Sequence, residues 1–186
     1  MTSLIRCKAC GYVTREGKIK DVCPACGVPA KMFGPYTDTI SPKRRLILGL
    51  HLHPIMVHFP QAFSITLFLL LVLSHFVYAE IKWMYLYAII VISFFLPFSV
   101  ILALLTGLFD GKIRFRKVTT PLLKKKMILG VLLLITSIAL AFVTFSRQLT
   151  ASPAYEIITL LTILAVACGA GLGLIGGQLT DAKLPG

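Results

Sequence analysis

Charged residues are scarce in this chain, and acidic residues are scarcest. Only 14% of the 186 residues are charged, and 19 Lys and Arg against 7 Asp and Glu give a formal net charge of +12. An average soluble domain is about 25% charged. The sequence also lacks paired carboxylates, a nucleophile–base set and a glycine-rich phosphate loop. These absences argue against a disordered chain, an ordinary soluble enzyme, and a hydrolytic or transferase enzyme. A redox carrier or oxidoreductase component needs none of these groups.

Apolar residues fill most of the chain after residue 45. Hydrophobic residues make up 57% of the sequence, and the mean hydropathy is +0.88. A membrane-spanning helix needs about 20 apolar residues. The sequence therefore predicts an all-α membrane protein, a four-transmembrane-helix bundle over residues 46–186. A small domain over 1–36 and a linker over 37–45 are expected to precede it, with residues 34–42 forming an extended tether. The four uncharged apolar runs are residues 46–79, 83–109, 127–146 and 157–180.

The basic residues predict how the chain crosses the membrane. They gather before the first apolar run and in the connection 110–126. Since basic loops stay on the cytoplasmic side, both termini are predicted to be cytoplasmic in an inner or plasma membrane. The same connection suits anionic headgroups, so the lipid bilayer is an expected partner. Nucleic acid is not expected as a partner, because the basic residues have no other feature of nucleic-acid binding.

Four of the five cysteines form two C-x2-C pairs, Cys7 with Cys10 and Cys23 with Cys26. Each pair makes a turn that directs two thiolates inward, and two facing turns give a tetrahedral metal site. No signal peptide precedes the pairs, so we expect thiols rather than disulfides. The spacing does not separate iron from zinc, because both metals accept four thiolates. The fifth, Cys168, is expected to be a small buried hydrophobe.

The residues around these cysteines resemble the short rubredoxin-type domain of rubrerythrins. The wording that carries the resemblance is Cys7-Lys-Ala-Cys10-Gly-Tyr12 and Cys23-Pro-Ala-Cys26-Gly-Val-Pro29, followed by Phe33, within residues 4–36. The resemblance implies one iron held by four cysteines, which moves one electron between the ferric and ferrous states. It also implies that Tyr12 and Phe33 shield this metal. It favours iron over the structural zinc ribbon that the spacing also fits.

All four histidines lie in or beside the first apolar run, and two of them stand in the string His53-Pro-Ile-Met-Val-His58-Phe-Pro60. Ionisable residues at membrane depth are functional candidates by default. The predicted topology places His53 and His58 on the same side of the membrane as Asp110 and Met127. We therefore predict that these four residues hold a haem b or a quinone. In the alternative, the histidines only cap and hydrogen-bond a helix that Pro60 kinks.

The apolar part of the chain resembles an uncharacterised family of small four-helix membrane proteins. The resemblance covers residues 51–186 and rests on HPIMVHFP at 53–60, Gly107-Leu-Phe-Asp110 and Gly176-Gly177-x-Leu179. It implies kinship with b-type cytochromes. The family pattern also has a histidine on the third helix, where this chain reads Lys124-Lys-Lys-Met127. This departure weighs against a haem held by histidines of the first and third helices.

Together these features predict a membrane-anchored electron-transfer protein. It would pass electrons between a cytoplasmic Fe(Cys)4 centre and a haem b or quinone near the cytoplasmic side of the bundle. A soluble or membrane redox partner is expected, and the glycine-rich fourth run suggests a homodimer. The alternative is a zinc-ribbon or redox-sensing interaction protein, with the helices as a membrane anchor.

Overall fold

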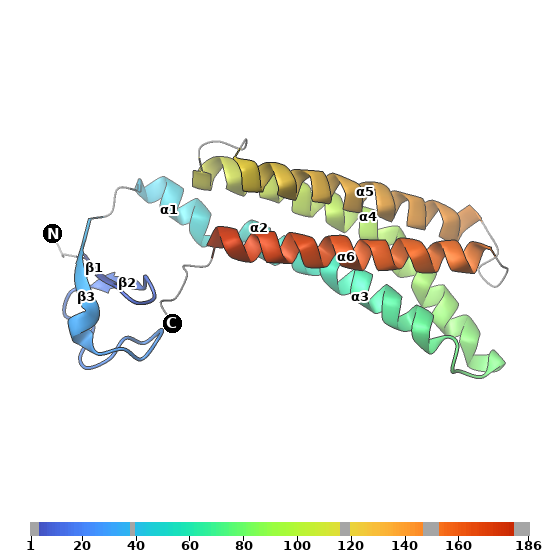
Figure 1. Cartoon of the computed structure of the whole chain (residues 1–186), viewed down its shortest axis with the longest axis horizontal. Helices are drawn as coiled ribbons and strands as arrows, with labels where there is room; N and C mark the ends of the chain where they lie inside the picture. The colour runs from blue at the N-terminus through green and yellow to red at the C-terminus, as the bar shows by residue number, and fades with distance from the viewer. Residues whose placement is uncertain (1–3, 38–39, 116–119, 147–152, 181–186) are drawn as a thin grey trace. The chain divides into compact units, whose positions relative to one another are not determined.

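The computed structural model describes residues 4–37, 40–115, 120–146 and 153–180 (Figure 1). The chain divides into two compact units, an N-terminal unit that ends at Arg45 and a helical unit over Leu46–Gly177. Each unit makes its own set of internal contacts.

A small antiparallel sheet forms the N-terminal unit. Its strand order is β2-β1-β3, so β1 is hydrogen-bonded on both sides. Cys7 ends β1, directly opposite Phe33 in the register of β1 with β3. Cys7 and Cys23 are the buried hydrophobic residues of this unit among those described. Because this unit has so little apolar core, we expect a bound metal to supply much of its stability. The elements are β1 (Leu4–Cys7), β2 (Val13–Arg15), the 3-10 helix η1 (Ala30–Met32) and β3 (Phe33–Tyr36).

The first apolar run is broken into three helices. The helices are α1 (Pro42–Gly49), α2 (Leu52–Met56) and α3 (His58–Leu73). The first break lies at His51, whose φ of 48° is left-handed. The second break lies at Val57, between the end of α2 and the start of α3. It agrees with the predicted kink, because Pro60 has no amide hydrogen to donate to the carbonyl of Met56. α1 begins at Pro42, inside the segment 37–45 that was predicted to be a linker.

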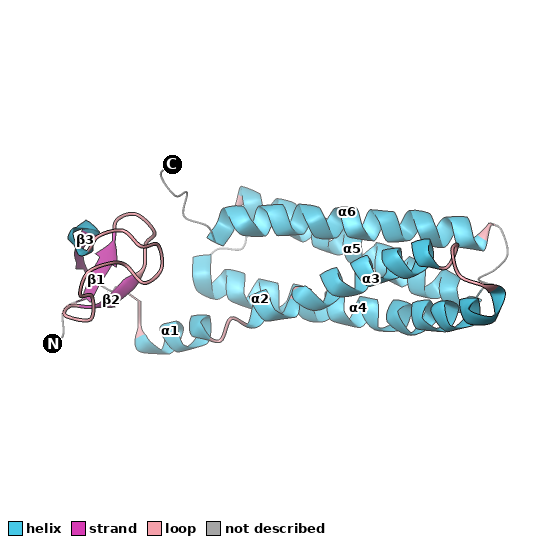
Figure 2. Cartoon of the chain, turned by 90° about the horizontal axis from the view of Figure 1, so that it is seen from below, coloured by secondary structure: helices cyan, strands magenta, loops and turns pink. Residues whose placement is uncertain are grey.

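The remaining helices are α4 (Ala79–Phe115), α5 (Pro121–Ser146) and α6 (Ala154–Thr180). Figures 1 and 2 show α3, α4, α5 and α6 running side by side in the helical unit. Four segments are long and apolar enough to cross a membrane. The chain is therefore a multi-pass membrane protein, as the four apolar runs predicted. The segments are Pro42–Leu73, Ala79–Arg114, Pro121–Ser146 and Ala154–Gly177.

The bundle core combines aliphatic side chains with small hydroxyl groups. Leu67 of α3, Ile89 of α4 and Leu140 of α5 are fully buried in one cluster. That cluster also contains Cys168, which confirms its expected role as a buried hydrophobe. The buried hydroxyls of Ser64, Thr136 and Thr162 each donate to the carbonyl four residues earlier on their own helix. Such bonds satisfy polar groups where no water is present.

The glycine-rich face of α6 receives side chains from its neighbours. A Cβ at Gly171 would lie 3.3 Å from Leu129 of α5, and one at Gly176 would lie 3.7 Å from Lys126 Nζ. The Gln61 amide of α3 donates to the Gly169 carbonyl at 3.4 Å. The glycines thus give room to two polar side chains, Gln61 and Lys126.

Candidate metal centre and the His53 cluster

The four clustered cysteines come from two loops built in the same way. Each loop has a glycine directly after its second cysteine, and Gly11 (φ 78°) and Gly27 (φ 76°) both adopt the left-handed conformation that residues with side chains avoid. The repeated geometry explains why two short C-x2-C segments fold alike. The closing backbone bonds are Cys7 N–H to Tyr12 O (2.8 Å), Gly11 N–H to Cys7 O (2.9 Å), Cys23 N–H to Val28 O (2.8 Å) and Gly27 N–H to Cys23 O (2.9 Å).

The sulfur positions fit one tetrahedral metal ion. Cys7 Sγ lies 3.8 Å from Cys26 Sγ, and Cys10 Sγ lies 3.7 Å from Cys23 Sγ. All four sulfur atoms are within 4.8 Å of one another. A tetrahedron with metal–sulfur bonds of about 2.3 Å has edges of about 3.8 Å. The donor set therefore suits iron or zinc, and the cysteines selected by their spacing do lie together.

The pKa values of Cys7 and Cys26 indicate that the four cysteines cannot all be thiolates unless a cation is bound between them. The Cys10 amide and then the Ala9 amide donate to the Cys7 sulfur and lower the pKa of Cys7 to about 7, although burial opposes them. The Val28 amide lowers the pKa of Cys26, but lost hydration and the three neighbouring sulfurs together raise it to about 12. Four thiolates cannot ionise side by side without a positive charge between them. Metal binding therefore displaces protons from this cluster.

The N-terminal unit also matches a known family. Residues 6–34 match the family model of the rubrerythrin, rubredoxin-like domain. This match contains all four cysteines and both loops, and it confirms the rubredoxin-like domain predicted from the two C-x2-C pairs. No curated protein and no solved structure matches the chain. The aromatic residues implied to shield the metal differ in burial, since Phe33 is half-buried and Tyr12 is 39% exposed.

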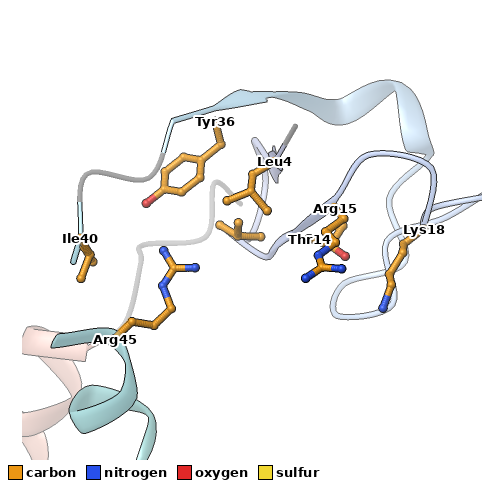
Figure 3. Close-up of a pocket in the computed structure, with 8 residues that line it drawn as sticks. Leu4, Thr14, Arg15, Lys18, Tyr36, Ile40 and Arg45 are labelled. Atoms are coloured by element: carbon orange, nitrogen blue, oxygen red, sulfur yellow. The ribbon is translucent and has the colours of Figure 1, made fainter. Parts of the chain in front are cut away.

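A basic hollow lies elsewhere in the N-terminal unit (Figure 3). Its volume is about 500 Å³. Three cationic side chains, Arg15, Lys18 and Arg45, line it together with Tyr36 and Leu4, and none of its described lining residues is acidic. The hollow therefore presents a positive surface beside an aromatic ring.

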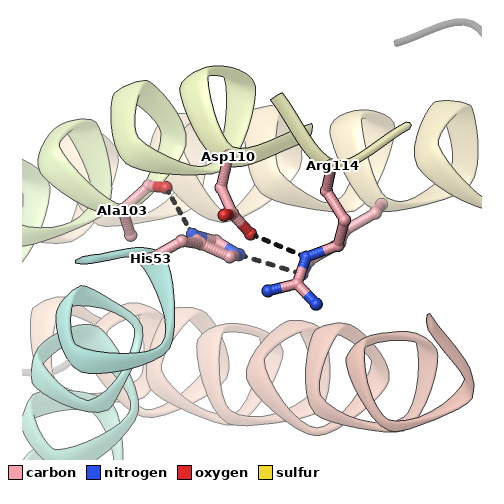
Figure 4. Close-up of polar contacts among 5 residues, drawn as sticks. His53, Ala103, Asp110 and Arg114 are labelled. Atoms are coloured by element: carbon pink, nitrogen blue, oxygen red, sulfur yellow. Dashed lines mark hydrogen bonds and ion pairs between the residues drawn. The ribbon is translucent and has the colours of Figure 1, made fainter. Parts of the chain in front are cut away.

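In the helical unit, His53 of α2 is held through both ring nitrogens (Figure 4). Its Nδ1 lies 3.2 Å from the carbonyl of Ala103 in α4, and its Nε2 lies 3.0 Å from Lys126 Nζ in α5. Because a carbonyl only accepts, the hydrogen is on Nδ1, and Nε2 accepts from the ammonium group. The ring also lies against Gly107, where a Cβ would be only 2.9 Å from His53 Cε1.

The predicted residue Asp110 belongs to the same cluster. Asp110 Oδ2 lies 3.4 Å from Arg114 Nε, one helical turn further along α4. Figure 4 shows this pair beside the His53 ring. We name the group of His53, Asp110, Arg114 and Lys126 the His53 cluster; it joins three helices at one end of the bundle.

The other two predicted residues lie outside the His53 cluster. The His58 ring is exposed, and its Nδ1 lies 2.6 Å from the carbonyl of Pro54, so it completes the broken turn between α2 and α3. Met127 is 39% exposed. Of the four predicted residues, the structure brings His53 and Asp110 together and leaves His58 and Met127 outside.

Sequence reasoning missed Lys126 as a site residue, although a signal was present. On α5 the positions 4, 7 and 11 residues after Lys126 are Gly130, Leu133 and Ser137, and all three are buried. Lys126 thus continues the inward-facing stripe of α5, whereas Lys124 and Lys125 are exposed. The three consecutive lysines 124–126 were interpreted as a basic helix end, so the inward-facing periodicity of Lys126 was overlooked.

Proposed function

We propose that the protein is a membrane-anchored electron-transfer protein, in which an Fe(Cys)4 centre exchanges electrons with a haem b or quinone in the helical bundle. The observation that carries the proposal is the tetrahedral cysteine cluster of a rubredoxin-like domain on one chain with four membrane-spanning segments. When bound, iron supplies a one-electron couple between its ferric and ferrous states.

The residues around the cysteines support a redox centre. Hydrogen bonds from backbone amides to the sulfurs tune the potential of such sites, and the Cys10 amide at Cys7 and the Val28 amide at Cys26 supply them here. Cys7 and Cys23 are buried, whereas Cys26 is exposed. A partner can therefore approach the centre from the side of Cys26.

The charge distribution supports a cytoplasmic N-terminal unit. The basic residues before α1 and between α4 and α5 favour the cytoplasmic side under the positive-inside rule. Both termini and the His53 cluster then belong to the reducing side of an inner or plasma membrane. Free thiols, which a metal needs, persist there.

The partner we propose is a soluble or membrane redox protein with an acidic face. The hollow presents the positive charge of Arg15 and Lys18 in the same unit as the cysteine cluster. Complementary charge speeds encounter and orients redox partners. Binding to such a partner should therefore weaken as the salt concentration rises.

The haem and quinone versions use different residues. A haem iron needs a free imidazole lone pair. His58 offers its Nε2 for this, because Nδ1 takes part in the contact with Pro54 and the ring is exposed. In this version a Soret band is present and is lost in His58→Ala.

A second candidate function is a zinc-ribbon interaction protein, because the sulfur tetrahedron fits zinc equally well. Re-oxidation of the dithionite-reduced centre in sealed membrane vesicles separates the two functions. Electron transfer predicts re-oxidation that slows when quinones are extracted or when haem supply is withheld, and no signal in Cys10→Ser. A centre that shows no redox change in wild-type vesicles rejects electron transfer and supports the zinc ribbon.

A further inference from the structure

Lys126 places a positive charge on the inner face of the bundle. Its Nζ reaches His53 of α2 and lies close to Gly176 of α6, which has no side chain to accept a hydrogen bond. Lys125, the preceding residue on the same helix, is exposed. An inward-facing ammonium group in a membrane bundle is costly unless an acceptor compensates it.

The acceptors within the described chain compensate this charge only in part. The nearby carboxylate, Asp110, is paired with Arg114. The hydrogen-bond partner of Lys126 among the described residues is His53, which is neutral because its Nε2 accepts. An ammonium group has three N–H donors, and His53 takes one of them.

Such a cluster suits a ligand that offers an oxygen acceptor, because the Lys126 ammonium group has N–H donors that His53 does not use. His53 has no free nitrogen for a metal, since Nδ1 faces the Ala103 carbonyl and Nε2 faces Lys126. Haem ligation by His53 is thus disfavoured. Of the two proposed electron acceptors, a quinone carries such an acceptor in its carbonyl oxygens.

We propose that Lys126, oriented by His53, donates a hydrogen bond to the carbonyl oxygen of a membrane quinone. This inference rests on the proposed electron-transfer function. Of the two cofactors proposed there to exchange electrons with the Fe(Cys)4 centre, haem b and quinone, it selects the quinone. His53 is a positioning residue, because it fixes the ammonium group through its bond to Ala103 of α4. The Asp110–Arg114 ion pair lies on α4, the helix that also contains Ala103.

Quinone binding to the purified full-length protein tests this site. The probe is a short-chain ubiquinone or menaquinone analogue, measured by equilibrium binding in detergent after removal of endogenous quinone. Lys126→Met, which removes the ammonium group, is expected to weaken binding at least about tenfold, because a charge-assisted hydrogen bond is lost. Lys126→Arg, which keeps a charged donor, should retain most of the affinity. Lys125→Met makes the same change of charge on an exposed neighbour and should bind like the wild type.

Photolabelling gives a readout that does not depend on the folding of a variant. An azido-quinone should label the wild-type peptide that contains Lys126 and Met127. Equal binding by Lys126→Met and wild type, or labelling confined to other helices, overturns the proposal. Binding of anionic lipid with no binding of quinone also overturns it and identifies a lipid phosphate site instead.

The outcome separates this inference from the proposed function, because quinone binding is measured whatever metal the cysteines hold. A zinc-loaded protein that binds quinone through Lys126 rejects electron transfer but retains the site. An iron-loaded, redox-active protein that binds no quinone rejects the site and leaves the haem version at His58.

Discussion

The His53 cluster depends on a close approach between His53 and the backbone of α4 at Gly107. A Cβ at position 107 would lie 2.9 Å from His53 Cε1 and 3.1 Å from Nδ1. Non-bonded carbon atoms prefer about 3.5–4.0 Å. In Gly107→Ala the ring must therefore move by roughly 0.5 Å or more, away from the Ala103 carbonyl and out of line with Lys126.

The expected cost follows from three effects. Overpacking costs about 1–3 kcal/mol, and weakening the hydrogen bond to the Lys126 ammonium costs up to about 1.5–3 kcal/mol. The higher helix propensity of alanine stabilises the folded state by about 1 kcal/mol relative to glycine. Gly107→Ala should thus lower the free energy of unfolding by about 2 kcal/mol or more, as measured by SDS-induced unfolding of the purified protein in detergent micelles.

Two other glycines supply controls. Gly49→Ala introduces a Cβ with nothing within 4 Å and should be neutral or stabilising. A Cβ at Gly130 would lie 2.6 Å from Leu104 Cδ2, the end of a flexible side chain that can rotate away, so Gly130→Ala should fall between the other two. If Gly107→Ala is as stable as Gly49→Ala, the packing of His53 against α4 is wrong.

Three further predictions concern the metal centre and the end of the bundle that lies away from the His53 cluster. Removing the metal with a chelator should unfold the N-terminal unit and leave the helical circular dichroism signal almost unchanged; loss of the helical signal would show that the bundle also depends on the metal. Metal affinity should rise with pH, because the pKa of about 12 at Cys26 means that its thiol loses a proton when the metal binds. Competition with a chelator between pH 6 and about 8 measures this affinity. An affinity that does not change over this range would contradict the prediction. Tyr155→Phe removes the hydroxyl that donates to the Leu71 carbonyl at 2.8 Å, and it should cost about 1 kcal/mol in the same unfolding assay, whereas Tyr78→Phe, at an 80% exposed residue, should be neutral.

The sequence was sufficient where a short segment determines its own geometry. Two C-x2-C pairs followed by glycines fold into equivalent loops by local hydrogen bonds, so their spacing predicted the sulfur cluster. The apolar runs predicted the four membrane spans, because length and hydropathy alone decide whether a helix can cross a bilayer. Pro60 likewise predicted the break before α3, since a missing amide is a local property.

The sequence was insufficient where function depends on which way a side chain faces. His53 and His58 look alike in the string 53–60, yet the break at Val57 leaves His53 in contact with α4 and His58 exposed. Lys126 looked like part of a basic helix end. Its role required knowing that α5 turns this position toward His53, which is a tertiary contact between residues far apart in the chain.

The identity of the metal at the cysteine cluster tests the electron-transfer proposal most directly. The measurement is an absorption spectrum of the purified full-length protein, recorded before and after dithionite, together with its metal content. The proposal predicts one iron per chain and a red oxidised protein whose sulfur-to-iron charge-transfer bands bleach on reduction. A colourless protein that contains one zinc per chain, with no change on adding dithionite, would contradict it.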